Sequence, residues 1–432
     1  MTQKTRGETD EEGRRVDRPF LGPAAGMASL ARLIPFATGN GRSALMDYFL
    51  TETQQMIRDV ARQIAEERLA PIAAELDETE RFPREIIEIL AQADLAGVLI
   101  PEEYGGLGGG VLENCLVVEE LSRVESGTAI SFAATWLGIT PILLAGNEEQ
   151  KRRYLPKVAS GQLLAAFALT EADAGSDAGN IRTTAVLDGD HYVLNGTKQW
   201  ITNGGEADIY TVIALTDKKK GARGASAFIV EKGTPGFSFG KKEKKMGIRA
   251  STTRELIFQD VRIPRENLLG KEGQGFILAL KTLDRARPGV GAQAVGIAQG
   301  ALEAALRYAR ERIQFGQPIS SFQAIQHMLA DMATQIEAAR ALVYSVARYI
   351  DAGAKEFSKE AAMAKLFASD VAMKVTTDAV QIFGGYGYMR DYPVEKMMRD
   401  AKITQIYEGT NQIQRNEIAA QLIKEAASRK KK

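Results

Sequence analysis

The chain has 432 residues, enough for two or three domains with substantial cores, and its 45% hydrophobic and 25% charged residues are ordinary values for a globular protein. Basic and acidic side chains balance at 55 each, so the composition gives no support to nucleic-acid binding, and no stretch predicts a membrane span. Cys115 is the only cysteine, which excludes intrachain disulfides and thiolate metal clusters. A single cysteine fits a reducing compartment. Acidic residues at Glu8, Asp10, Glu11 and Glu12 argue against a transit peptide, so we expect the cytoplasm in preference to a mitochondrial matrix.

Histidine is scarce as well. Only His191 and His327 are present, so a zinc site or a histidine-dependent triad is disfavoured and no metal site is predicted. If the chain is an enzyme, the chemistry that remains is a carboxylate base working with an organic cofactor.

The first part of the chain separates into an extension and a helical region. Residues 1–45 are charged and lack periodicity, and we expect a disordered extension or a wrongly assigned start. From residue 46 to 162 the pattern is helical. Thr51 and Gln54 have the spacing of a capping box, and Pro71 must kink or end the first helix.

The pattern changes at about residue 163. The segment 163–275 alternates apolar and polar residues between hairpin-type turns, which predicts a β-sandwich or small barrel. From 276 to 432 four long amphipathic segments predict a helical bundle. The fold class is therefore α+β and multidomain, with an N-terminal all-α domain, a middle β domain and a C-terminal four-helix bundle.

One carboxylate stands out near the end of the chain. Ile403 and Ile406 precede Glu408 at helical spacing, Gly409 and Thr410 then loosen the helix, and an apolar face resumes afterwards. A glutamate at a break between two helices can be aimed into a cavity, although a solvated surface glutamate is the ordinary alternative.

The sequence IYEGTNQIQR at 406–415 resembles the signature of acyl-CoA dehydrogenases, flavoproteins that oxidise the Cα–Cβ bond of acyl-CoA thioesters. PEEYGG at 101–106 resembles another family segment; without a following Lys-Ser/Thr it is not a phosphate-binding P-loop. The resemblance implies FAD, an acyl-CoA substrate and an electron-transfer flavoprotein partner. It also implies an oligomer, commonly a homotetramer, because FAD in this family is shared between subunits.

The resemblance extends to residues that would bind the cofactor. FALTEADAGSD at 167–177 and QWITNG at 199–204 resemble flavin-contacting motifs, and RIQFG at 312–316 resembles a segment that meets the FAD diphosphate of a neighbouring subunit. Without the family, the threonines and serines would be ordinary caps of strand ends. The cofactor-binding residues implied are Leu169, Thr170, Trp200, Thr202, Arg312, Phe315, Gln323, Gln381, Gly384, Gly385, Thr410 and Gln412.

Glu408 is implied as the catalytic base. A minority of the family carries the base at the start of the bundle, where this chain has Ala286 in TLDRARP at 282–288. The implied reaction is α,β-dehydrogenation to a trans-2-enoyl-CoA. Three alternatives stay open at this point: a flavin oxidase or monooxygenase, an enoyl-CoA reductase, and a non-catalytic helical binding protein. The substrate-binding residues implied are Ser176, Asp284, Arg287 and Gly409.

Overall fold

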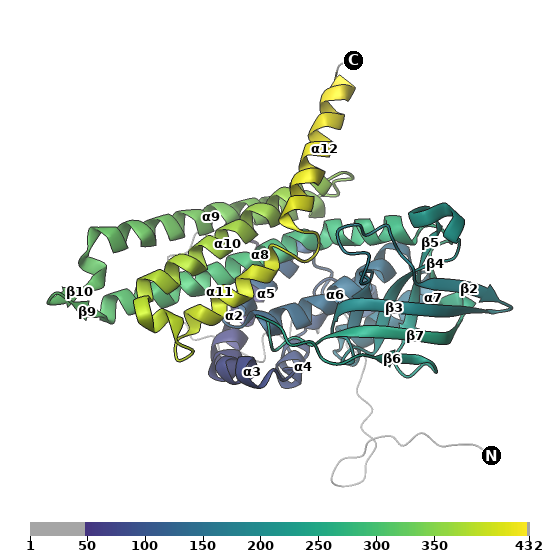
Figure 1. Ribbon diagram of the computed structural model, residues 1–432, viewed down its shortest axis with the longest axis horizontal. Helices are drawn as coiled ribbons and strands as arrows, with labels where there is room; N and C mark the ends of the chain where they lie inside the picture. The colour runs from purple at the N-terminus through teal and green to yellow at the C-terminus, as the bar shows by residue number, and fades with distance from the viewer. Residues whose placement is uncertain (1–47, 430–432) are drawn as a thin grey trace, which may run out of the picture. The chain divides into compact units, whose positions relative to one another are not determined.

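The computed structural model describes residues 48–429, so the prediction for residues 1–45 lies outside the described residues. The predicted fold class is confirmed: helices come first, a mixed sheet follows, and a helical bundle ends the described chain (Figure 1). The labels in Figure 1 are used from here on.

Six helices make the first part. Thr51 caps the first of them with the predicted capping box, in which its side chain accepts from the Gln54 backbone N–H. Around Pro71 the helix gives way to a π-turn (Ala65–Leu69) and a 3₁₀ turn (Ala70–Ile72), as expected where a proline removes a donor. The six helices are α2 (Glu52–Ile64), α3 (Ala73–Thr79), α4 (Arg84–Gln92), α5 (Val111–Ser122), α6 (Ser126–Ala145) and α7 (Glu148–Ala159).

Helix α6 has the length and apolar composition that could cross a bilayer, with a mean hydropathy of 1.6. In this fold 67% of that stretch is buried, and the helix packs against β1, α5 and α8. An all-round apolar surface is what a core helix requires. Helix α6 therefore lies between the sheet and the bundle and lines the cavity described below.

The strands of the β part form one hydrogen-bonded sheet of eight strands, and their apolar side chains share one core. The strand order is β6-β7-β3-β2-β4-β5-β8, and β1 pairs in parallel with β4. The bulge between Lys198 and Ile201 interrupts the β3–β7 register. The strands are β1 (Ala165–Ala168), β2 (Thr184–Asp188), β3 (His191–Thr202), β4 (Ile209–Leu215), β5 (Ala225–Glu231), β6 (Phe237–Phe239), β7 (Thr253–Pro264) and β8 (Leu268–Leu269).

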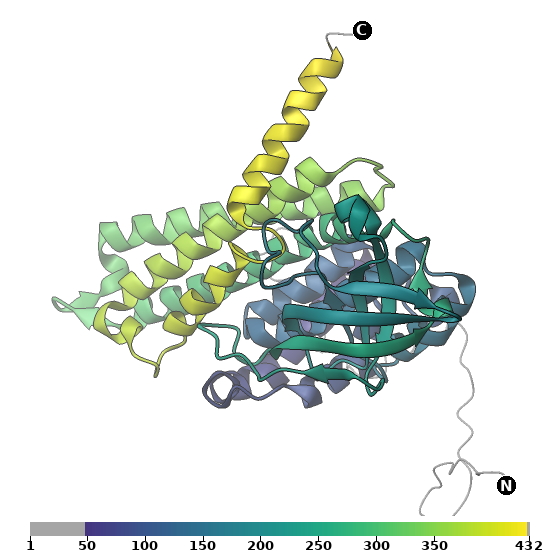
Figure 2. The ribbon, with the colours of Figure 1, turned by 45° about the vertical axis from the view of Figure 1, so that its right-hand side comes forward.

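The bundle packs through small residues. Gly291 lies so close to α9 that a Cβ there would meet Val343 Cγ2 at 2.8 Å, which explains a glycine inside a long helix. Figure 2 shows the bundle beside the sheet, with the last helix projecting away from both. The elements are α8 (Gly275–Glu311), the hairpin β9 (Ile313–Gln314) and β10 (Gln317–Pro318), α9 (Gln323–Asp351), α10 (Ser358–Phe383), α11 (Pro393–Thr404) and α12 (Asn411–Arg429).

Candidate active site

Glu408 lies in the short loop between α11 and α12, so the predicted break between two helices is present. Its φ is 52°, and that of Gly409 is 91°. Two successive left-handed residues turn the chain sharply, and a glutamate in this region is strained. A Cβ at position 409 would meet Gln414 Nε2 at 2.6 Å, so this position requires glycine.

Two side chains hold this loop by its carbonyl groups. Gln414 Nε2 donates to the carbonyl oxygens of Glu408 at 3.1 Å and Gly409 at 2.9 Å. Lys365, fully buried on α10, donates from Nζ to the Gly409 carbonyl at 2.8 Å and to Asn411 Oδ1 at 2.9 Å. A buried ammonium bonded in this way fixes the loop firmly, because breaking it would leave the charge unpaired.

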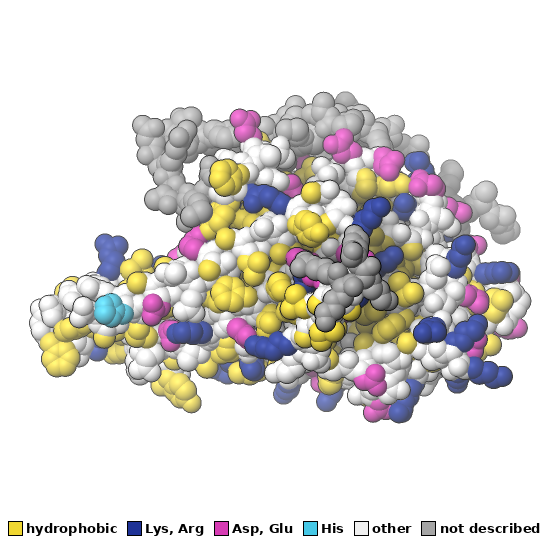
Figure 3. Space-filling view, turned by 90° about the horizontal axis from the view of Figure 1, so that it is seen from above, with side chains coloured by type: hydrophobic (Ala, Val, Ile, Leu, Met, Phe, Trp, Pro, Cys, Tyr) yellow, Lys and Arg dark blue, Asp and Glu magenta, His cyan; other side chains and the backbone are white. Residues whose placement is uncertain are grey.

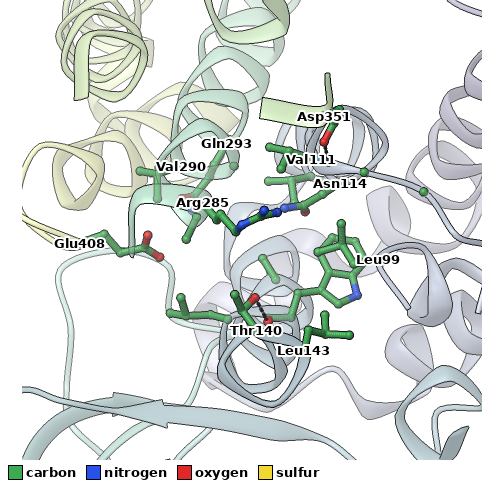
Figure 4. A pocket seen from close by; sticks show the side chains of 18 of the residues that line it. Leu99, Val111, Asn114, Thr140, Leu143, Arg285, Val290, Gln293, Asp351 and Glu408 are labelled. Atoms are coloured by element: carbon green, nitrogen blue, oxygen red, sulfur yellow. Dashed lines mark hydrogen bonds between the residues drawn. The ribbon is translucent and has the colours of Figure 1, made fainter. Parts of the chain in front are cut away.

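The Glu408 side chain lies between two cavities. One, of about 140 Å³, is lined by α5, α6 and the start of α8 (Figure 4). The other, of about 630 Å³, lies between the sheet, α11 and the loop that carries Glu408. Glu408 Oε2 is buried and has no hydrogen-bond partner within residues 48–429. Such an unpaired buried oxygen is free to accept a proton from a molecule bound beside it.

Burial raises the pKa of Glu408 to about 7, and the nearby positive charges of Lys365 and Arg287 offset part of that rise. The carboxylate acts as a base only when ionised. We expect kcat/KM to increase with pH through a midpoint near 7 and to fall roughly 100-fold between pH 8 and pH 5. The rate of flavin reduction in stopped flow, measured across this pH range, tests the prediction. A rate that does not change with pH would contradict Glu408 as the base.

The larger cavity is lined by four residues predicted to bind the cofactor, Thr170, Trp200, Thr202 and Thr410, and by two predicted to bind the substrate, Ser176 and Gly409. Thr170, Ser176, Trp200 and Thr202 line it from the sheet, and Gly409 and Thr410 line it from the loop that carries Glu408. Trp200 is 58% exposed, has a φ of 56° and sits at the β3 bulge. The bulge turns the indole out of the sheet, where it can cover the face of a planar ring.

A buried ion pair supports the strand ends behind Thr170. Lys198 Nζ lies 2.7 Å from Glu171 Oε1 and donates to the Leu169 carbonyl at 2.9 Å. Glu171 also accepts from the backbone N–H groups of Arg182 and Thr183. Burial lowers the pKa of Lys198 to about 8, so the ammonium remains charged at neutral pH and fixes the segment around Thr170.

A second network attaches the loop before β7 to α11. Asp400 accepts a hydrogen bond from the Ile248 backbone N–H at 2.5 Å, and Arg399 donates to the Met246 carbonyl at 2.9 Å. Lys396 bridges Asp400 at 2.6 Å and Glu125, which caps the N-terminus of α6, at 2.9 Å. The walls of both cavities are therefore joined to the helix that carries the loop of Glu408.

Arg312, Gly384 and Gly385 line a separate cavity of about 450 Å³ where α8 and α10 end. The Arg312 guanidinium lies over the Tyr386 ring, 5.2 Å from its centroid. Phe315, Gln323 and Gln381 are exposed and do not line this cavity. The chain therefore carries two separate groups of predicted cofactor-binding residues, one at the larger cavity beside Glu408 and one around Arg312.

The remaining predicted site residues, Asp284, Arg287, Leu169 and Gln412, do not line the two cavities beside Glu408. Asp284 and Arg287 pair with each other at 2.5 Å, and Asp284 also accepts from the Ser358 hydroxyl at 2.5 Å. Neither lines the two cavities beside Glu408, so in this structure the pair supports the start of α8. Leu169 is buried behind Thr170, and Gln412 lines a surface cavity with Thr410.

Sequence reasoning missed Lys365 and Lys198, which hold the two sides of the larger cavity. A signal for Lys365 was available, since it occupies the same helix face as Ala361 and Ala368, both buried. A lysine on an apolar face requires buried partners. Lys198 gives no comparable signal, because its partner Glu171 lies 27 residues away.

Comparison with known proteins agrees with this geometry. Family models for the N-terminal, middle and C-terminal domains of acyl-CoA dehydrogenases match residues 51–162, 166–261 and 273–423. The short-chain specific acyl-CoA dehydrogenase of Clostridium acetobutylicum is 52% identical over 88% of this chain and 100% of its own length. The acryloyl-CoA reductase (NADH) of Anaerotignum propionicum is 53% identical over 89% of this chain and 98% of its own.

Among solved structures, a chain from the electron transferring flavoprotein structure of Acidaminococcus fermentans is 58% identical, with a TM-score of 0.86 over 87% of this chain and 99% of that one. The three-part fold and a desolvated carboxylate beside a cavity for a planar ring define an FAD-dependent oxidoreductase. The chain belongs to the acyl-CoA dehydrogenase family.

Proposed function

We propose that this protein oxidises the Cα–Cβ bond of a short saturated acyl-CoA to the trans-2-enoyl-CoA, with Glu408 as the general base. The observation that carries the proposal is the buried Glu408 carboxylate, held between a small acyl-sized cavity and a larger cofactor-sized one. A pKa near 7 suits a base that must be ionised at neutral pH yet accept a proton strongly.

Glu408 would supply two groups to the reaction. Its carboxylate removes the α proton. Its backbone N–H makes no hydrogen bond to another described backbone group and can donate to the thioester carbonyl oxygen. That donation stabilises the negative charge that develops on the oxygen as the proton leaves. Lys365 and Gln414 keep both groups in place by holding the neighbouring carbonyls.

The larger cavity fits an isoalloxazine ring. Its volume of about 630 Å³ is typical of a cofactor site, and Thr170, Thr202 and Thr410 offer hydroxyl groups around the exposed Trp200 indole. FAD, when bound there, accepts the β hydrogen as hydride. Leu169 would border the ring from behind Thr170, and Gln412 would approach it from α12.

The small cavity supports a short acyl group. Its volume of about 140 Å³ is close to the ~150 Å³ of an engineered cavity that binds benzene, a group of six heavy atoms. Trp136, Leu99 and Val111 close the end of the cavity with bulky side chains. A long acyl chain would collide with them unless the helices moved.

We propose a homotetramer in which each FAD contacts two subunits. The cavity of Arg312, Gly384 and Gly385 supports this, because its guanidinium suits a diphosphate and it is distinct from the cavity beside Glu408. Phe315, Gln323 and Gln381 would complete the site in the assembly.

Helix α12 supports the same proposal. Its Leu422 is 47% exposed and its Ile423 70% exposed, and Figure 3 shows hydrophobic side chains gathered on the face that carries this helix. Exposed apolar faces of this kind are normally covered by a partner.

The electron acceptor we propose is an electron-transfer flavoprotein, supported by the 58% identical chain found in such a structure. A role in β-oxidation and a cytoplasmic location fit this chemistry and the single buried Cys115. Ser176, at the edge of the larger cavity, is proposed to contact the CoA portion.

Anaerobic titration of the purified FAD-loaded protein with butyryl-CoA tests the function. We expect the flavin absorbance band to bleach as the thioester is added. If no saturated acyl-CoA bleaches it, the dehydrogenase proposal fails. Reoxidation of chemically reduced enzyme by crotonyl-CoA would then point to the reductase direction named for the A. propionicum relative.

A further inference from the structure

The acyl cavity has a polar end. Arg285 lies on α8, and Figure 4 shows its side chain crossing the cavity from α8 towards Asn114 on α5. Arg285 is exposed, so its guanidinium remains accessible within the cavity. Asn114, by contrast, is 8% exposed. The carboxylate of Glu408 lies on the other side of Arg285 (Figure 4).

Neither the Arg285 guanidinium nor the Asn114 side chain donates a hydrogen bond to another described residue. The Asn114 side-chain NH₂ group donates no hydrogen bond in the part of the chain that the structure describes, so it can donate to the oxygen of a bound carboxylate. The Arg285 guanidinium forms no hydrogen bond or close ion pair with any residue from 48 to 429. A purely hydrocarbon acyl group offers these donors no acceptor, whereas a terminal carboxylate could accept hydrogen bonds from both.

Asp351 is the one acidic group on this wall, and it is already engaged. Its two carboxylate oxygens accept from the backbone N–H groups of Val111 at 2.8 Å and Leu112 at 3.0 Å. It thereby caps the N-terminus of α5, where the helix dipole offsets part of its charge. The Arg285 guanidinium attracts this carboxylate electrostatically but forms no hydrogen bond with it, so its planar donor fork remains available to another anion.

We propose that the acyl cavity of this enzyme binds a terminal carboxylate through Arg285 and the Asn114 amide, so that its substrates include CoA thioesters of short dicarboxylic acids. The proposal rests on the dehydrogenase function above and specifies its substrate class. Glu408 and the carboxylate site lie at opposite sides of one small cavity, which places the thioester end at the base and the free carboxylate at Arg285.

Two thioesters that differ only at the terminal group provide the test. Pentanoyl-CoA ends in a methyl group where glutaryl-CoA ends in a carboxylate. We expect wild-type enzyme to reduce its flavin with glutaryl-CoA at a kcat/KM about 10- to 100-fold higher than with pentanoyl-CoA, the range given by a hydrogen-bonded charged group. Arg285→Gln should remove this preference by lowering only the glutaryl-CoA value. Lys281→Gln, one turn earlier on α8 and outside the cavity, is the matched control.

Binding gives an independent readout. In Glu408→Gln enzyme, where turnover is blocked, the Kd for glutaryl-CoA should rise about 10-fold or more on adding Arg285→Gln, while that for pentanoyl-CoA stays unchanged. Equal effects on both thioesters, or no preference in wild type, would overturn the carboxylate site. Bleaching by pentanoyl-CoA alone would overturn it and leave the dehydrogenase function standing, whereas bleaching by neither would reject the function itself.

Discussion

Glu408→Gln should lower the rate of flavin reduction by butyryl-CoA about 10²- to 10⁴-fold, the usual contribution of a general base. Glutamine keeps the size and the hydrogen-bonding oxygen of the side chain but cannot take the α proton. The loop should stay in place, because Lys365 and Gln414 hold it by main-chain carbonyls. Stopped-flow absorbance under anaerobic conditions measures the rate.

This variant should not lose stability. The raised pKa of Glu408 means that folding disfavours the ionised carboxylate; this cost is present above pH 7 and disappears as the pH falls towards the ordinary value for glutamate. At pH 8 the thermal midpoint should therefore equal or exceed that of wild type. Glu149→Gln, an exposed position on α7, is the control and should keep full activity. Wild-type turnover in Glu408→Gln would exclude Glu408 as the base.

Lys198→Met should produce the largest loss of stability, about 3–5 kcal/mol, because it leaves the Glu171 carboxylate buried without its countercharge. The Lys198 side chain is fully buried, and it also donates to the Leu169 carbonyl beside Thr170. We expect a lower thermal midpoint and weaker FAD retention, measured by the ratio of flavin to protein absorbance after gel filtration.

The control for this prediction is Lys218→Met, which removes an exposed lysine from the same part of the chain. Replacing both partners, Lys198→Met with Glu171→Leu, should restore part of the stability, since no buried charge is then left unpaired. A yellow, equally stable Lys198→Met protein would show that the ion pair does not support the cofactor site.

Much of the fold follows from local sequence. The capping box at Thr51, the interruption at Pro71 and the helix break around Glu408 are each set by a few neighbouring residues, and the structure has all three. The arrangement of the strands depends on pairings between distant segments, such as β1 beside β4. Alternation of apolar and polar residues predicts strands without their order, so the sequence could not give this pairing.

The candidate site also combines residues that sequence motifs predict with residues whose roles depend on contacts between distant segments. Motif resemblance found the residues around the larger cavity, including Trp200, whose exposure depends on a bulge that no local pattern reveals. It did not find Lys365, because its role arises from a contact between α10 and the loop that carries Glu408. It also assigned Asp284 and Arg287 to the substrate, which stays a prediction; in this structure the two side chains pair with each other.

The most direct measurement of the central claim uses butyryl-CoA carrying deuterium at both α positions. If the α proton leaves to Glu408 as the flavin is reduced, reduction in stopped flow at pH 8 will be slower than with unlabelled butyryl-CoA. The same rate for both thioesters, with substrate binding shown to be fast, would contradict a reaction in which Glu408 breaks the α C–H bond.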